Sequence, residues 1–266
     1  MKKQYTIGEI GKILGLTNDA IRFYEKKDLV HPQIDPENRY RMYTLTNVLE
    51  LLDVIYYRHL DIPVDTIYDL SKSPDPEDIV SLLEQKAEQT KRKIYYEQQL
   101  LKKLEHFRTM FYEIERNKNI CSIRNFPESV VLFEGHDRED FFIHDIQYMS
   151  QDQFVLCAFY ILFEWNADSM EQKRTFVSLD VDVLKEMDIK IKNQGMHMIK
   201  NMKCVHLAVR MKDGSIDASD INRIQKYAKE NQIALEHVCY VREIPMTFYN
   251  DLEHYYAEIF VPVKGE

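Results

Sequence analysis

A long stretch without proline or glycine constrains the fold of this chain more than any other feature of its sequence. It runs from Glu77 to Lys118 and consists mainly of Glu, Gln, Lys, Leu and Ala, which all favour a helix. At 1.5 Å per residue, an unbroken helix of this length measures roughly 60 Å. A proline-punctuated joint, Ser71–Pro76, precedes it. We therefore divide the chain into three segments, 1–75, 76–118 and 119–266.

The apolar residues of this predicted helix form a narrow stripe. They recur at spacings of three, four and seven, and Lys and Glu fill most positions between them. An isolated helix with so narrow a stripe is not stable in water, so the stripe needs a partner surface. That surface is either the chain's own C-terminal segment or the same helix of a second copy. We favour a dimerisation coiled coil, and hence a homodimer. The stripe consists of Ile79, Leu83, Ala87, Thr90, Ile94, Leu101, Leu104, Phe111 and Ile114.

Charge and hydropathy exclude some classes of protein. The longest apolar run, Phe154–Phe163, has about half of the ~20 residues that a membrane helix needs, and nothing at the N-terminus resembles a signal peptide. We expect a cytoplasmic protein with no membrane partner. The net charge is −9, and residues 1–72 hold ten basic and eleven acidic side chains. Bulk charge therefore does not predict nucleic-acid binding, which needs cations at the phosphates.

The cysteines do not indicate a metal site. Cys121, Cys157, Cys204 and Cys239 are widely separated and form no C-x-x-C pair. This argues against a zinc site and against a disulfide framework. We expect four reduced thiols, mostly in strands, with no metal and no cofactor.

The N-terminal segment begins with the pattern of a helix-turn-helix. Thr6 and Glu9 form a capping box, and Gly15 supplies a tight turn after the first short helix. Thr17 then caps a second helix over Asn18–Lys26. Two short helices joined by such a turn place the second helix in the major groove of DNA.

A wing is predicted to follow the two helices. Ile34–Asn38 is a turn-rich tip, and Arg39–Tyr43 comes directly after it. Arg39 and Arg41 lie two residues apart and so would share one face of a strand, with Tyr40 packed beneath them. Two guanidinium groups on one face suit contacts with phosphates.

These blocks, Tyr5–Ile10, Ile21–Lys26 and Arg39–Tyr43, resemble the DNA-binding domain of the MerR family in order and spacing over residues 4–70. The resemblance implies a winged helix-turn-helix, a symmetric dimer on double-stranded promoter DNA, and RNA polymerase as a partner. One departure is Asp61, which stands where the family has a Gly, and Arg58 is the substitute we expect for a second-wing phosphate contact. The predicted DNA-binding residues are Thr17, Asn18, Arg22, Tyr24, Lys26, Arg39, Tyr40, Arg41 and Arg58.

The C-terminal segment contains two similar halves. Each half is predicted to hold a strand, a helix and two further strands, which gives one antiparallel sheet with helices on one face and a concave second face. The first half places these elements at Val130–Glu134, Asp140–Tyr148, Phe154–Glu164 and Phe176–Asp180. The second half places them at Val205–Met211, Ser219–Lys229, His237–Glu243 and His254–Val263. The fold class is therefore multidomain, α followed by α+β, with a duplicated β-α-β-β unit. In the last strand, the alternation of side chains turns Tyr255, Ala257, Ile259 and Val261 towards a predicted helix-packed core.

This layout, with Phe126-Pro127 and the closing strand Tyr256–Val263, resembles the gyrase-inhibitor-like effector domain of BmrR-type regulators. The resemblance implies that Glu258 receives a small, lipophilic or cationic effector. The alternative is that Glu258 pairs with Arg242 or Lys203 on a neighbouring strand, because a buried carboxylate needs a partner. The predicted effector-binding residues are Tyr148, Tyr160, Glu164, Trp165, Tyr240, Tyr256 and Glu258.

Two other functions were weighed for the C-terminal segment. Some isolated domains of this type resemble small-molecule hydrolases that activate water with a Glu and a Tyr, and the segment could also be a degenerate module that senses nothing. The attached DNA-binding segment argues against catalysis, so we expect no enzyme. Metal or redox sensing is set aside because Cys121 stands alone beside the long helix.

Overall fold

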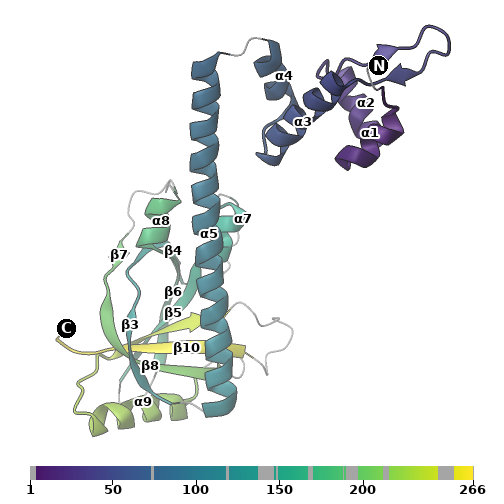
Figure 1. Ribbon diagram of the computed structural model, residues 1–266. Helices are drawn as coiled ribbons and strands as arrows, with labels where there is room; N and C mark the ends of the chain where they lie inside the picture. The colour runs from purple at the N-terminus through teal and green to yellow at the C-terminus, as the bar shows by residue number, and fades with distance from the viewer. Residues whose placement is uncertain are drawn as a thin grey trace. The chain divides into compact units, whose positions relative to one another are not determined.

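The computed structural model describes residues 4–72, 75–117, 120–136, 147, 149–166, 170–187, 189, 197–211, 216–244 and 255–265. The chain divides into two compact units, Met1–Lys91 and Arg92–Glu266. The boundary falls inside the long helix α5, Pro76–Asn117, whose 42 residues confirm the helix predicted from the sequence (Figure 1). Within the described residues, no helix is both long enough and apolar enough to cross a membrane.

The first unit is built from short, well-capped helices. Thr6 and Glu9 form the predicted capping box at the start of α1, and Gly15 ends that helix with φ 68°. A side chain at Gly11 would come within 2.7 Å of the Leu16 carbonyl oxygen, so the turn requires glycine there. The elements are α1 (Ile7–Leu14), α2 (Asn18–Lys26), β1 (Gln33–Ile34), β2 (Arg41–Met42), α3 (Leu45–His59) and α4 (Val64–Lys72). Their buried core includes Ile10, Ile21, Tyr43, Leu51 and Ile62.

The wing differs in detail from the prediction. Strand β2 holds only Arg41 and Met42, and Arg39 lies in the preceding turn with φ 61°. The prediction that Arg39 and Arg41 share a strand face is therefore wrong, because the turn-rich tip extends further than its Pro and Asn residues indicate. Asp61 has φ 55°, which is the left-handed conformation that favours the glycine found there in the family.

The second unit is built around an antiparallel sheet of eight strands in the order β3-β8-β10-β9-β5-β6-β4-β7. The three main strands of each half occur in mirrored order, β8-β10-β9 and β5-β6-β4 with β5 against β9, which agrees with the predicted duplication. The strands are β3 (Ser122–Phe126), β4 (Ser129–Gly135), β5 (Ala158–Trp165), β6 (Met170–Asp180), β7 (Met198–Ile199), β8 (Met202–Met211), β9 (Val238–Glu243) and β10 (Tyr255–Pro262).

The helices of the second unit correct one prediction. Residues Gln151–Leu156 form α7, so the predicted strand Phe154–Glu164 begins only at Ala158. Ser150 and Gln153 make a capping box that starts this helix, a signal that the apolar run after it hides. The structure adds α8 (Val181–Glu186), and α9 (Ala218–Glu230) matches the predicted second-half helix. The helix predicted at 140–148 lies outside the described residues, apart from position 147.

The two faces of the sheet are covered by different helices. On one face, Ile221 and Ile224 of α9 pack against Ala257, Ile259 and Val261 of β10, as the alternation in that strand predicted. The other face is covered by the C-terminal part of α5, from which Phe107, Met110 and Ile114 are buried against Ala208, Ile244 and Tyr256 (Figure 1). The second face is therefore not an open surface, and it encloses the polar groups described below.

Candidate functional site

The surface of α2 carries the first group of predicted site residues. Thr17 caps this helix, and its hydroxyl accepts a hydrogen bond from the Ala20 amide at 3.1 Å. Asn18, Arg22 and Lys26 are exposed, and Tyr24 is half-buried. Arg22 forms an ion pair with Asp19 at 3.7 Å on the same exposed face. Arg22 is therefore accessible to a phosphate or a base edge.

The wing is tied to α2 by a contact that the sequence analysis missed. Arg41 Nε donates to Glu25 Oε2 at 2.7 Å, and the buried Tyr43 hydroxyl also donates to Glu25. Burial, followed by the hydrogen bond to Glu25, raises the pKa of Tyr43. The prediction that Tyr40 packs under the arginines is wrong, because this side chain is 70% exposed. It is Tyr43 that fills the core below the wing.

Arg58 is exposed, and it also has a structural partner. Its guanidinium donates to the Ile62 carbonyl oxygen at 2.8 Å and so closes the turn around Asp61 after α3. This contact orients the turn in which the family resemblance implies a glycine at position 61.

The second group of predicted residues includes Glu258, which is fully buried on the α5-covered face of the sheet. Strand register places Glu258 beside Arg242 and Arg242 beside Tyr160, in one row across β10, β9 and β5. Arg242 Nε donates to Glu258 Oε2 at 2.6 Å, and the second guanidinium nitrogen forms an ion pair with the same oxygen. Of the two alternatives left open by the sequence, the structure contains the pairing with Arg242.

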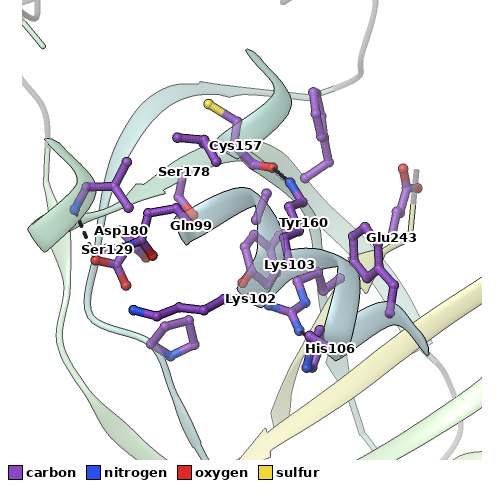
Figure 2. Close-up of a pocket in the computed structure, with 17 residues that line it drawn as sticks. Gln99, Lys102, Lys103, His106, Ser129, Cys157, Tyr160, Ser178, Asp180 and Glu243 are labelled. Atoms are coloured by element: carbon purple, nitrogen blue, oxygen red, sulfur yellow. Dashed lines mark hydrogen bonds between the residues drawn. The ribbon is translucent and has the colours of Figure 1, made fainter. Parts of the chain in front are cut away.

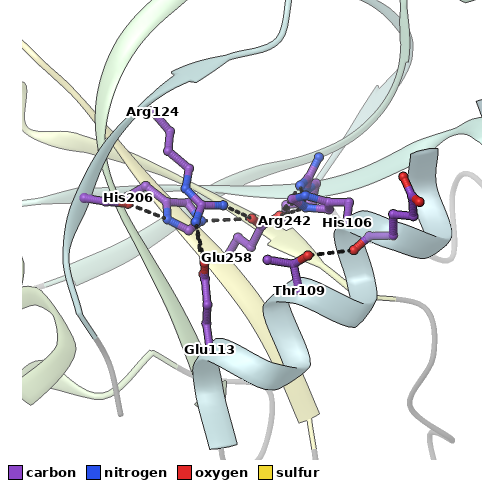
Figure 3. A network of polar contacts seen from close by, with 9 residues as sticks. His106, Thr109, Glu113, Arg124, His206, Arg242 and Glu258 are labelled. Atoms are coloured by element: carbon purple, nitrogen blue, oxygen red, sulfur yellow. Dashed lines mark hydrogen bonds and ion pairs between the residues drawn. The ribbon is translucent and has the colours of Figure 1, made fainter. Parts of the chain in front are cut away.

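Two histidines complete the surroundings of Glu258 (Figure 3). His206 Nε2 lies 2.9 Å from Glu258 Oε1, and His106 Nε2, on α5, lies 3.1 Å from Oε2. Arg124 lies 3.9 Å from Glu258 and holds Glu113 of α5 through two contacts at 3.0 and 3.1 Å. These residues link α5 to strands β3, β8, β9 and β10.

The network determines the charges of its members. Burial alone would raise the pKa of Glu258, but the charge of Arg242 and the contacts with both histidines hold that pKa well below its ordinary value. Burial lowers the pKa of His206, against the opposing contact with Glu258. Burial would also lower the pKa of Arg242, yet the neighbouring carboxylate raises it. Glu258 and Arg242 are thus a charged, mutually compensated pair at neutral pH.

A cavity of about 250 Å³ lies between α5 and the sheet beside this network (Figure 2). Its volume falls just below the range of ~300–1,000 Å³ usual for small-molecule sites. Side chains from α5, β4, β5, β6, α8 and β9 line it. The polar ones include Lys103, Ser129, Tyr160, Asp180 and Arg242, whereas Glu258 lies behind Arg242 and does not line it.

Lys103 projects from α5 into this lining. Its ammonium donates to the carbonyl oxygens of Val155 at 2.6 Å and Cys157 at 2.7 Å, where α7 turns into β5. Burial, and to a smaller degree the charge of Arg242, lowers the pKa of Lys103 to about 8. The sequence analysis missed Lys103, although its position four residues before Phe107 is in phase with the buried face of α5.

The predicted effector-binding residues are only partly brought together. Tyr160 lines the cavity, and Tyr240 lies on the same face of the sheet, against the ring of Phe126. Tyr256 packs on Phe111, and its hydroxyl donates to Glu115 of α5 at 3.0 Å. Trp165 packs with the α9 core on the opposite face, and Glu164 pairs with Lys173 at 3.4 Å. Tyr148 lies outside the described residues.

The thiols are not placed for chemistry. Cys157, Cys204 and Cys239 are buried, and burial raises the pKa of each to about 12, so the reactive thiolate is scarce at neutral pH. Among the described residues, no group of three His, Cys, Asp or Glu side chains could hold a metal ion.

The N-terminal geometry, with two capped helices, a two-stranded wing and an exposed second helix, defines a winged helix-turn-helix DNA-binding domain. Residues 5–73 match the model of the MerR HTH family regulatory proteins. These residues form a MerR-family helix-turn-helix domain, which confirms the resemblance seen in the sequence.

Individual relatives are similar to this chain over short stretches. The regulator CueR of Escherichia coli O6:H1 is 53% identical over 45 residues, which are 17% of this chain and 33% of CueR. The multidrug-efflux transporter 2 regulator of Bacillus subtilis strain 168 is 28% identical over 94 residues, 35% of this chain and 34% of that protein. The chain spans about a third to a half of the length of the first curated relatives. A solved EcmrR–DNA complex aligns over 97% of this chain and 99% of its own, with 16% identity and a TM-score of 0.38.

Proposed function

We propose that this chain is a transcriptional regulator that binds promoter DNA as a homodimer and responds to a small effector held in the cavity beneath α5. The observation that carries the proposal is the match of residues 5–73 to the MerR HTH family, together with the exposed face of α2. The proposed segments are the DNA-binding domain 1–75, the dimerisation helix 76–118 and the effector domain 119–266.

DNA binding is assigned to α2 and the wing. Arg22 and Lys26 are exposed on α2, and Asn18 lies at its N-terminal end, where a recognition helix contacts base edges. Arg39 and Tyr40 lie exposed at the wing, and Arg41 is held by Glu25 at the point where wing and helix meet. Tyr24 and Arg58 are proposed to contribute phosphate contacts, and Thr17 to orient the start of the helix.

Homodimer formation is assigned to the exposed stripe of α5. Leu83, Ile94, Leu101 and Leu104 are each 43–57% exposed and follow one another at separations of eleven, seven and three residues. This spacing continues the heptad expected of a coiled coil. These four residues are distinct from the buried Phe107, Met110 and Ile114, which pack on the sheet of the same chain.

The helix α3 presents a second exposed apolar stripe, which consists of Leu45, Leu49, Leu52 and Tyr56. A second copy would cover such surfaces.

Effector control is assigned to α5 because this helix lines the cavity. The cavity is lined from α5 by Gln99, Lys103, His106 and Phe107. A bound molecule would therefore contact this helix directly. A ligand shifts a protein between two states only through its different affinity for them. We propose that ligand binding changes the position of α5 on the sheet and thereby the geometry of the DNA-bound dimer. On promoter DNA that geometry would decide whether RNA polymerase engages.

Binding is favoured over catalysis in the cavity. A hydrolase of the kind considered above needs a carboxylate that can accept a proton from water. Glu258 is bonded to Arg242 and His206, and its low pKa makes it a poor base. The Tyr160 hydroxyl lines the cavity, and the strand register places it beside Arg242, which separates it from the paired Glu258.

The proposal is tested by selecting sites from a pool of random double-stranded DNA with the full-length chain. We expect inverted repeats to be enriched, because two recognition helices of a symmetric dimer bind two half-sites. Arg22→Ala should abolish the enrichment, while Lys91→Ala, an exposed control on α5, should leave it unchanged. Failure to enrich any repeat, or equal enrichment by Arg22→Ala, contradicts the proposal.

A further inference from the structure

The cavity beneath α5 exposes the cation Arg242 to a ligand. A site for a lipophilic cation would instead need an accessible carboxylate at this position. Arg242 lines the cavity, and Glu258 is 0% exposed behind it. Both carboxylate oxygens are engaged, one by Arg242 and the other by His206 at 2.9 Å. A cationic ligand would therefore meet the guanidinium and not the carboxylate, which is electrostatically unfavourable.

Lys103 adds a second positive charge without a compensating carboxylate. Its contacts at 2.6 and 2.7 Å are with two neutral carbonyl oxygens. Among the described residues, the acidic group that acts on its pKa is the Cys157 thiol and not a carboxylate. An ammonium has three donors, so one remains after these two bonds. A buried charge that has only neutral partners is costly, and an anion in the cavity would reduce that cost.

Two buried hydroxyl groups also line the cavity. Ser129 and Tyr160 are 2% and 1% exposed, and neither hydroxyl donates a hydrogen bond to an acceptor within the described residues. A buried donor that is left unsatisfied costs free energy. A ligand with acceptor oxygens would satisfy these donors, and it would do so best as a carboxylate, which only accepts.

Two carboxylates also line the cavity. Asp180 uses Oδ1 to accept the amides of Asp182 and Val183 at the start of α8, at 2.8 and 3.4 Å. Glu243 takes part in a contact of its own, while its buried Oε1 accepts no hydrogen bond within the described residues. The remaining lining contains apolar side chains, among them Phe107, Leu156 and Val183, which suit the body of an amphipathic molecule.

We propose that the effector is a small amphipathic anion, an organic carboxylate, whose charged end lies at Lys103 with Ser129 and Tyr160 as further donors and whose apolar body packs against Phe107 and Val183. This inference rests on the proposed function of the cavity as the effector site. It names the class of ligand that Lys103 and the two buried hydroxyl groups favour. This class has the opposite charge to a lipophilic cation.

The test compares three probes that share one aromatic body: phenylbutyrate, its primary amide and phenylbutylamine. Binding to the full-length dimer is measured by isothermal titration calorimetry at pH 7. We expect the carboxylate to bind roughly tenfold or more tightly than the amide, as a charge-assisted contact requires, and the amine to bind more weakly still.

Variants distinguish binding of the carboxylate in this cavity from its nonspecific binding to surface cations. Lys103→Met keeps the length of the stem and should remove the preference for the carboxylate over the amide, and Lys91→Met on the exposed side of α5 should not. Lys103→Met also loses two bonds to carbonyls, so Tyr160→Phe and Ser129→Ala provide a second measure. Each removes a buried donor and should weaken binding of the carboxylate roughly fivefold. Ser129→Ala should also raise the melting temperature of the free protein, whereas Tyr160→Phe also removes the oxygen that accepts from Arg242.

The outcomes distinguish the ligand class from the proposed function. Tighter binding of the amine than of the carboxylate overturns the anion inference but leaves the cavity as an effector site. No binding of the carboxylate, or carboxylate binding that Lys103→Met and Tyr160→Phe do not change, overturns the inference as well. DNA-site selection by the same preparation reports separately on the regulator, since it depends on Arg22 and not on this cavity.

Discussion

The two units of this chain use arginine in opposite ways. Arg22 on α2 has a side chain that is 59% exposed and an ion pair with Asp19 at 3.7 Å, a contact of little energetic weight. Arg242 has a side chain that is 18% exposed and is bound to the fully buried Glu258. The first cation is available to a partner that brings its own negative charge. The second is fixed by the protein and shapes a cavity.

This contrast also explains how an acidic chain can bind DNA. The net charge of −9 is spread over the whole sequence, and many acids are already occupied, such as Glu25 by Arg41 and Glu113 by Arg124. The cations proposed to contact phosphates are the exposed ones of α2 and the wing. Position, and not total charge, therefore decides binding.

The largest expected effect comes from removing the buried charge. Glu258→Gln leaves Arg242 buried without its partner, and breaking such a pair costs about 3–5 kcal/mol. The free energy of unfolding, measured with urea on the full chain, should fall by that amount. Replacing both residues, Arg242→Met with Glu258→Leu, should cost much less, because no unpaired charge remains. A loss below ~1 kcal/mol in Glu258→Gln would show that the two arginines are not used differently.

The exposed cations should affect affinity without affecting stability. Arg22→Ala together with Arg41→Ala is expected to weaken binding to a selected DNA site by roughly a hundredfold or more, or about 3 kcal/mol. Fluorescence anisotropy with labelled DNA gives the affinity. The melting temperature should change little for Arg22→Ala alone. An unchanged affinity in the double variant would remove α2 and the wing from the DNA-binding surface.

The pH dependence of effector binding tests whether Lys103 acts as the buried cation that binds the carboxylate. Burial lowers the pKa of this amine to about 8, so below pH 8 the free protein already carries the charge that a carboxylate needs. Above that pH the complex must take up a proton, and the affinity should fall by roughly tenfold per pH unit. Calorimetry with phenylbutyrate between pH 7 and pH 9.5 tests this fall. A flat profile would exclude Lys103 as the partner of the anion.

The smallest expected effect concerns Thr17. Its hydroxyl accepts the Ala20 amide at 3.1 Å, so its main role is that of a helix cap. Thr17→Ala should lower the free energy of unfolding by about 1 kcal/mol, and Thr17→Ser should restore most of it. DNA affinity corrected for folding should change little. A loss of affinity in Thr17→Ser would indicate a direct contact of the threonine methyl group.

The features that could be predicted from the sequence are those fixed by local chemistry. The capping box at Thr6 and Glu9, the glycine turn at Gly15 and the unbroken α5 all depend on neighbours within a few residues. The alternation in β10 likewise identified Ala257 and Ile259 as core. Where the local pattern was ambiguous, as in the apolar run at Phe154, a short helix was mistaken for a strand.

The candidate site was predicted only in part because it depends on partners that are distant along the chain. His106 lies 152 residues before Glu258, and Lys103 lies 54 residues before Cys157. No periodicity specifies such pairs. The sequence did show that Glu258 would need a partner, and it named Arg242 as one candidate. It could not show that α5 would cover the same face and supply the remaining groups.

The proposed function depends on the exposed apolar residues of α5 joining two copies of the chain, so that two recognition helices act on one duplex. Sedimentation equilibrium of the chain at micromolar concentration measures whether they do. We expect twice the mass of the 31.9 kDa chain, and a single mass for Leu101→Glu combined with Leu104→Glu, whose side chains lie exposed on that stripe. A mass of 31.9 kDa for the unaltered chain would rule the dimer out.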